Sequence, residues 1–211
     1  GSEMCIRDSF NAWAGEEQTN AFIAWAGEQV QARHGVRVVH TRLKDTAEAV
    51  NRVVAERTAG RDRDGSVDLI WINGPNLLAL KQQGLLLGPV LDALPNARFV
   101  DRVGKPSNTI DFTLPVEGFA VPWRLAQVVF IYDSARLTDR ARLPRSAPAL
   151  LEWSRARPGR VTHPNASNFL GATFLKQALV DLLPDAAALQ RPVSDDAVFA
   201  ATTAPLWAWY E

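Results

Sequence analysis

The residues of this chain best suited to contact a ligand are tryptophans, asparagines and glutamines that stand beside short apolar runs. Trp71 and Asn73 follow the apolar run VDLI, and Trp13 and Trp123 stand at similar points beside Gly or Pro, with Gln127 soon after. An indole ring stacks on a flat or cationic molecule with roughly 0.5 to 2 kcal/mol per contact, and an amide both donates and accepts hydrogen bonds. These residue types favour reversible binding of a small solute, although packing in the protein core is an equally good interpretation of each tryptophan.

Strand-to-helix junctions are the elements that must position these side chains. Alternating or β-branched runs predict strands, and a 3.6-residue period predicts helices. The predicted order is strand, helix, strand, helix, strand, helix, at residues 10–15, 16–34, 36–41, 45–60, 67–72 and 76–83. Such alternation predicts an α/β lobe with a mainly parallel sheet, and sheets of this kind bind ligands at the carboxyl edge of their strands.

The second half of the chain predicts a connector and then the start of another α/β unit. Residues 92–113 lose periodicity, and two extended runs, GFAVPW and QVVFIYD, follow them. The elements predicted after these runs are a helix around Trp153, a short strand at 160–162 and a helix at 169–183. We therefore expect a first lobe at residues 10–126, followed by a crossover and a partial second lobe at 127–211.

Composition and missing motifs exclude several classes of function. The 211 residues include 23 basic and 23 acidic side chains, so no net charge draws the protein to nucleic acid or to an anionic membrane. No apolar run approaches the roughly 18 residues that a membrane span needs. The HExxH and GxSxG patterns are missing, and the single cysteine, Cys5, lies in the leading segment. We expect no catalytic residue, no cofactor and no metal site.

The two ends of the chain are unusual. Residues 1–9, GSEMCIRDS, show no periodicity and are interpreted as a foreign, adapter-like leader. Residues 194–211 carry an apolar helical pattern to the last residue, so we expect the native protein to continue further. The exposed aromatic cluster expected at that end comprises Trp207, Trp209 and Tyr210. Trp25, in contrast, lies on the face of a predicted helix and is expected in the core.

Four stretches of the chain resemble a known protein family. They are WAGEEQTNAFIAWAGEQVQARHGVRV, the segment from LKDTAEAV to KQQGLL, PWRLAQVVFIYDSARL and PGRVTHPNASNFLGATFLKQAL. Together they resemble the periplasmic solute-binding components of ABC transporters of the YnjB-like family, over nearly all of residues 10–211. The resemblance implies the type II periplasmic-binding fold, in which crossover strands join two α/β lobes, with the second lobe incomplete in this chain.

The resemblance also implies a function. A periplasmic, monomeric protein of this kind captures a solute between its lobes and delivers it to an inner-membrane ABC permease and ATPase complex, without catalysis. The family is linked to thiamine uptake, so thiamine or a similar cationic or aromatic solute is the expected ligand. By position, the resemblance implies a ligand site at Trp13, Trp71, Asn73, Trp123, Gln127, Ser167, Asn168 and Phe169.

Two other classes of protein remain open at this stage. The effector-sensing domain of a transcription regulator can share this fold, and its gene would encode a helix-turn-helix where a transport protein has a signal peptide. An enzyme built on the same lobes, such as a thiaminase, would be expected to show a cysteine or a paired acid.

Overall fold

The computed structural model describes residues 6–191 and 193–211 and divides the chain into two compact units. The first unit contains the residues up to Phe112 together with Val116–Val121. The second contains Thr113–Pro115 and Pro122–Glu211. Cys5, in the segment interpreted as a foreign leader, lies outside the described residues.

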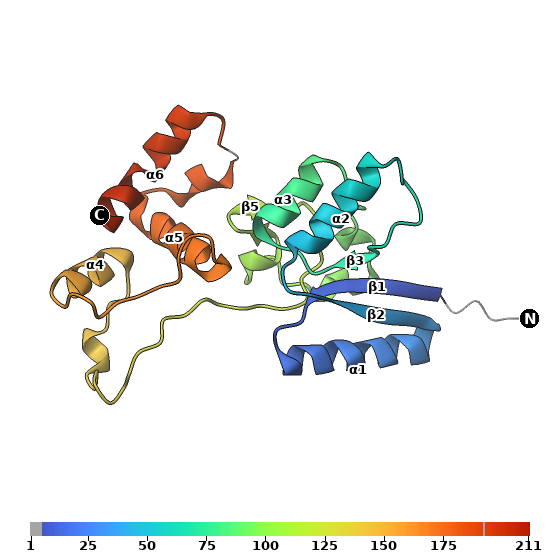
Figure 1. Cartoon of the computed structure of the whole chain (residues 1–211), viewed down its shortest axis with the longest axis horizontal. Coiled ribbons are helices and arrows are strands. Elements are labelled where there is room, and N and C mark those ends of the chain that lie inside the picture. The colour runs from blue at the N-terminus through green and yellow to red at the C-terminus, as the bar shows by residue number, and fades with distance from the viewer. Residues whose placement is uncertain (1–5, 192) are drawn as a thin grey trace, which may run out of the picture. The chain divides into compact units, whose positions relative to one another are not determined.

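The first unit is built on a three-stranded parallel sheet. Its strands are β1 (Ile6–Trp13), β2 (Val36–Leu43) and β3 (Leu69–Ile70), in the order β2-β1-β3. Its α-helices are α1 (Glu17–His34), α2 (Ala47–Thr58) and α3 (Gly74–Gln82). Figure 1 shows α1 below the sheet and α2 and α3 above it. The predicted alternation of strands and helices around a parallel sheet is therefore confirmed for this unit.

Local sequence signals explain where the helices of this unit begin and end. Gly35 follows α1 with φ 69°, and its N–H donates to the carbonyl of Gln31 at 2.9 Å, as expected for a glycine that ends a helix. Before α2, Asp45 Oδ1 accepts from the N–H of Ala47 at 2.8 Å, and Glu48 Oε1 accepts from the N–H of Asp45 at 3.1 Å. The predicted Asp-x-x-Glu cap is thus formed.

The first strand extends further toward the amino terminus than the sequence pattern indicates. Residues 6–9 belong to the segment interpreted as foreign, yet they pair with β2 in continuous register, from Ile6 opposite Val36 onward. A strand is held by backbone hydrogen bonds, so it can form without an alternating side-chain pattern. The foreign origin of residues 1–9 remains a prediction.

Three segments predicted as strands differ in the structure. The strand expected at 67–72 is limited to Leu69–Ile70, because β3 pairs only with β1 at two positions among the described residues. The segments 160–162 and 127–133 have no regular secondary structure. A strand needs a neighbouring backbone to satisfy its N–H and C=O groups, and the described chain offers these segments none. The crossover predicted at 127–133 is therefore not seen as a strand.

Short elements complete the first unit and lead into the second. The 3₁₀ helices are η1 (Leu91–Ala93), η2 (Pro95–Phe99), η3 (Pro106–Asn108), η4 (Arg140–Arg142) and η5 (Ala186–Gln190). The short strands are β4 (Ile110–Asp111) and β5 (Leu114–Pro115). Of these elements, η2, η3 and β4 lie within residues 92–113, where the sequence loses its periodicity.

Apart from β5, the regular elements described in the second unit are helices. Its α-helices are α4 (Ala147–Arg155), α5 (Phe169–Leu182) and α6 (Asp196–Tyr210). The buried core of this unit comprises Ala147, Ala178, Leu179, Leu206 and Trp209. The helices predicted around Trp153 and at 169–183 are confirmed.

The aromatic cluster expected at the end of the chain is only partly exposed. Trp207 and Tyr210 are 46% and 50% exposed, whereas Trp209 is 9% exposed and donates from Nε1 to the carbonyl of Ala147 at 2.8 Å. The prediction is wrong for Trp209 because α6 packs against α4 and α5, and one face of a helix must then turn inward.

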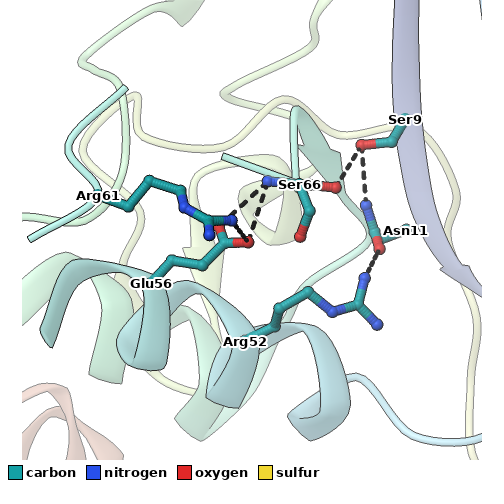
Figure 2. A network of polar contacts seen from close by, with 6 residues as sticks. All are labelled: Ser9, Asn11, Arg52, Glu56, Arg61 and Ser66. Atoms are coloured by element: carbon teal, nitrogen blue, oxygen red, sulfur yellow. Dashed lines mark hydrogen bonds and ion pairs between the residues drawn. The ribbon is translucent and has the colours of Figure 1, made fainter. Parts of the chain in front are cut away.

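A polar network fixes α2 to the strands of the first unit. Asn11 lies in β1 with no exposed surface, and its Oδ1 accepts from Arg52 of α2 at 3.2 Å (Figure 2). The Oγ of Ser9 donates to the carbonyl of Ser66 at 2.9 Å. A buried amide is tolerated only when its polar atoms are paired, so this contact sets the position of α2 on the sheet.

The same network continues to the loop after α2 and predicts a dependence on pH. The carboxylate of Glu56 accepts from the N–H of Ser66 at 3.1 Å and lies beside Arg61 (Figure 2). Hydrogen bonds from Ser66, with a smaller contribution from the charge of Arg61, hold the pKa of Glu56 below its ordinary value of 4.5. The resulting stabilisation is present above pH 4.5 and is lost as the pH falls through the lowered pKa.

We therefore expect the Glu56→Gln variant to lose less stability on acidification than the unchanged protein. Glutamine keeps an acceptor for Ser66 but has no proton to gain, so its unfolding free energy should vary less between pH 5 and pH 3, a window spanning about the usual titration range of Glu. Urea unfolding of both proteins at each pH measures the difference between the two profiles. If the unfolding free energies of the two proteins change in parallel with pH, the lowered pKa assigned to Glu56 is contradicted.

Candidate functional site

Three short loops connect the strands of the sheet to the helices that follow them. We call them the edge loops: residues 14–16, 44–46 and 71–73, which follow β1, β2 and β3. Because both strand pairs are parallel, the three edge loops lie at the same edge of the sheet. This carboxyl edge is the place where the sequence predicted ligand-binding residues.

Two of the predicted residues meet at this edge. The rings of Trp13 and Trp71 lie edge to face, with centroids 6.2 Å apart and planes at 82°. They are brought together because β1 and β3 are neighbours, and the N–H of Trp71 donates to the carbonyl of Asn11 at 2.9 Å. Trp13 is 39% exposed and Trp71 is half-buried, so the pair presents ring surface at the edge of the sheet.

A glycine makes room for this pair. The ring of Trp13 lies over Gly15, where an added Cβ would come within 2.1 Å of the ring atom Cζ2. No side chain fits at that distance, so the indole can lie over the loop only because residue 15 is glycine. The position of Trp13 is therefore fixed by the loop as well as by β1.

Asn73, the third predicted residue of this edge, stands at the start of α3. Its backbone is extended, with φ −157° and ψ 170°, and within the described structure its side chain makes no hydrogen bond that caps the helix. The N–H of Gly74 donates instead to the carboxylate of Asp111. The ring of Phe112 packs against Gly74, at 3.4 Å from the point where a Cβ would stand. The sequence analysis missed Asp111, because nothing in the local pattern shows that a residue 37 positions later returns to this helix.

The other five predicted residues belong to the second unit. Trp123 is 37% exposed and Gln127 is exposed, both in a segment without regular secondary structure. The Oγ of Ser167 donates to Asn165 Oδ1 at 2.7 Å. Asn168 Oδ1 accepts from the N–H of Leu170 at 2.9 Å, so this side chain caps α5. Phe169, the first residue of α5, is 53% exposed.

A cavity of about 250 Å³ lies in another part of the first unit, between α1 and β2. It is open to solvent, and its lining includes Glu28, Arg37 and His40. The predicted ligand residues do not line it. Within residues 6–191 and 193–211, no three metal-binding side chains come together, and no helix combines the length and the apolar character needed to cross a membrane.

Comparison with known proteins identifies the family. The family model for the bacterial extracellular solute-binding proteins matches residues 25–211. This chain belongs to that family. Protein YnjB of Escherichia coli (strain K12) is 41% identical to it over 202 residues, which cover 96% of this chain and 50% of YnjB. The resemblance to YnjB-like solute-binding proteins is thus confirmed, and the chain spans about half the length of this relative.

The structure agrees with this membership at the level of the first unit. A parallel sheet with helices on both faces is the architecture expected of one lobe of a periplasmic-binding protein. The match is to a family that binds extracellular solutes, which agrees with the interpretation of the chain as a binding protein.

Proposed function

We propose that this solute-binding chain captures a small molecule against the Trp13–Trp71 pair and serves an ABC importer. The observation that carries the proposal is the meeting of two partly exposed indoles at the carboxyl edge of a parallel sheet, in a member of a solute-binding family. Two rings held edge to face offer a rigid surface for a planar ring of a ligand. The molecule that best uses such a surface is a small aromatic solute, and thiamine is the first candidate.

The proposal extends to the second unit and to delivery. In that unit we propose Trp123, Gln127 and residues 167–169 as further ligand residues, and a hinge motion near residues 127–133 as the step that follows solute binding. The loaded protein then presents the solute to an inner-membrane permease and ATPase from the periplasm. In support, family members are extracellular solute-binding proteins.

A titration monitored by tryptophan fluorescence tests the proposal. We expect a saturable change, with micromolar or tighter affinity, when the full-length gene product is titrated with thiamine or with another member of a panel of aromatic solutes, polyamines, sugars and oxyanions. The emission of Trp13 and Trp71 changes because a bound ring alters their surroundings. If a different solute gives this response, the proposed transport function stands and only the proposed ligand changes.

Two results would contradict the proposal. If no solute of the panel changes the fluorescence or gives a heat of binding in calorimetry, the proposal that the protein captures a solute is wrong. Conversion of a solute to a product by the full-length protein would place it among enzymes on this fold.

A further inference from the structure

Strand β2 lies at one side of the parallel sheet and pairs there with β1 alone among the described strands (Figure 1). The N–H of Ala14 donates to the carbonyl of Leu43 at 3.1 Å, so the backbone groups of Leu43 point toward β1. The register with β1 is continuous, and backbone groups of successive residues in a strand point to opposite sides. The N–H and C=O groups of Val38 and His40 therefore point away from β1. We call this side of β2 the free edge.

An open cavity lies beside the free edge. The cavity of about 250 Å³ between α1 and β2 is lined by residues that include Ile23 and Gly27 of α1 and Val38 and His40 of β2. An added Cβ at Gly27 would lie 3.6 Å from the Cβ of Val38, so the glycine keeps the space above this strand residue open. A strand edge beside such a cavity suits an extended peptide, whose backbone pairs with the strand while alternate side chains enter the cavity.

The charges around the free edge are mainly positive. Strand β2 contains Arg37 and Arg42, both exposed, and no carboxylate. Arg33 and His34 lie in the last turn of α1, just before β2 begins. Within the described ranges, neither Arg37 nor Arg42 forms an ion pair. Glu28 is the acidic residue of the cavity lining. The free edge therefore favours a segment with acidic side chains.

A second copy of this chain does not match these charges. Two β2 strands would bring together four arginines and no carboxylate. An antiparallel pair centred between Val39 and His40 would place Arg37 of each copy opposite Arg42 of the other. Like charges directly opposite one another destabilise a strand pair, and charged side chains on an edge strand oppose self-association. The charges thus select against self-pairing and for a partner of opposite charge.

We propose that the free edge of β2 and the cavity beside it bind an extended, acidic segment of another protein. The segment adds to the sheet as a strand antiparallel to β2, and its backbone exchanges hydrogen bonds with Val38 and His40. Its side chains opposite these two residues enter the cavity, because directly opposite side chains share a face of the sheet. Acidic side chains at its ends meet Arg37 and Arg42. This surface is separate from the edge loops, so the inference does not depend on the proposed solute.

A capped six-residue peptide, Glu-Thr-Val-Thr-Val-Glu, is the probe for this surface. In the antiparallel register its first glutamate lies opposite Arg42 and its last opposite Arg37, while its valines lie opposite His40 and Val38. We expect the fluorescently labelled peptide to bind the full-length gene product saturably, as measured by fluorescence anisotropy. Failure of this peptide to bind would overturn the proposal.

N-methylated peptides test the backbone pairing without any change in the protein. Methylation of both valine nitrogens removes the two N–H groups that face β2, and we expect it to weaken binding at least about tenfold, as for the loss of two hydrogen bonds. The matched control carries the methyl groups on the two threonine nitrogens, which face solvent, and should change the affinity less than about threefold. Equal losses for the two peptides would overturn the strand pairing.

Charge reversal in the protein tests the acidic preference. The double variant Arg37→Glu, Arg42→Glu should weaken binding of the glutamate peptide about fivefold to tenfold, as for two exposed ion pairs, and should strengthen binding of the peptide Lys-Thr-Val-Thr-Val-Lys. The control is Arg63→Glu, an exposed arginine in the loop after α2, which should leave both affinities within about twofold. Equal binding of the two peptides to the unchanged protein would refute the charge preference.

Amide hydrogen exchange, followed by nuclear magnetic resonance, locates the bound peptide. The N–H groups of Val38 and His40 should exchange fast in the free full-length protein and slowly when the peptide is bound. The N–H of Val39 points toward β1 and should be protected in both states, which provides an internal control. Slow exchange of Val38 and His40 without peptide would show that another part of the native protein covers the edge, and would overturn the proposal.

Discussion

Replacing Trp71 by alanine is expected to weaken binding of an aromatic solute by roughly tenfold, the equivalent of about 1.4 kcal/mol. The ring of Trp71 lies edge to face with Trp13 at a centroid distance of 6.2 Å, so its loss removes one stacking surface and also releases the other ring. Contacts with an indole contribute about 0.5 to 2 kcal/mol, and two coupled contacts approach the upper end of that range. Calorimetric titration of the full-length variant measures the effect.

Trp25→Ala is the matched control for this prediction. Trp25 is 54% exposed on α1, contacts the ring of Phe22 and belongs to none of the edge loops. Its removal deletes an indole without touching the site, so affinity should stay within about twofold, as for a substitution with no shared partners. Equal losses for Trp71→Ala and Trp25→Ala would refute the assignment of the site.

Replacing Trp209 by alanine is expected to destabilise the second unit by about 3 to 5 kcal/mol, the usual cost of emptying a large buried site. Trp209 is 9% exposed in the core where α4, α5 and α6 meet. Its loss also leaves the carbonyl of Ala147 without the donor that now lies at 2.8 Å. Chemical denaturation, monitored by circular dichroism to follow helix content, measures the change in unfolding free energy.

A neighbouring tryptophan provides the control. Trp207 lies two positions earlier in α6, is 46% exposed and donates from Nε1 to Thr203 Oγ1 one helical turn back. Trp207→Ala should cost less than about 1 kcal/mol, because surface substitutions seldom cost more. A larger loss for Trp207→Ala than for Trp209→Ala would contradict the packing described for this unit.

Much of the first unit was predictable because its signals are local. The end of α1 at Gly35 and the cap formed by Asp45 and Glu48 depend on residues within a few positions of one another. The proximity of Trp13 and Trp71 could also be predicted, because strand-to-helix alternation places the ends of parallel strands at one edge of the sheet. Whether either ring faced a ligand or the core could not be read from the pattern.

The errors concern contacts between distant parts of the chain. Trp25 was expected in the core but is 54% exposed, since periodicity tells which residues share a helix face and not what covers that face. The strand at 67–72 was predicted too long because strand length depends on the neighbours available for pairing. Asp111 was missed for the same reason, as its partner Gly74 lies 37 positions away.

The geometry of the tryptophan pair also has an optical consequence. Two indoles with centroids 6.2 Å apart are close enough for their electronic transitions to couple, and ring planes at 82° place the two chromophores in a fixed, twisted arrangement. Such coupled chromophores give paired bands of opposite sign in circular dichroism. The circular dichroism spectrum of the unliganded protein would then report the arrangement of the two rings. A solute that tilts either ring would alter the sign or the size of these bands, so that binding could be followed without a label.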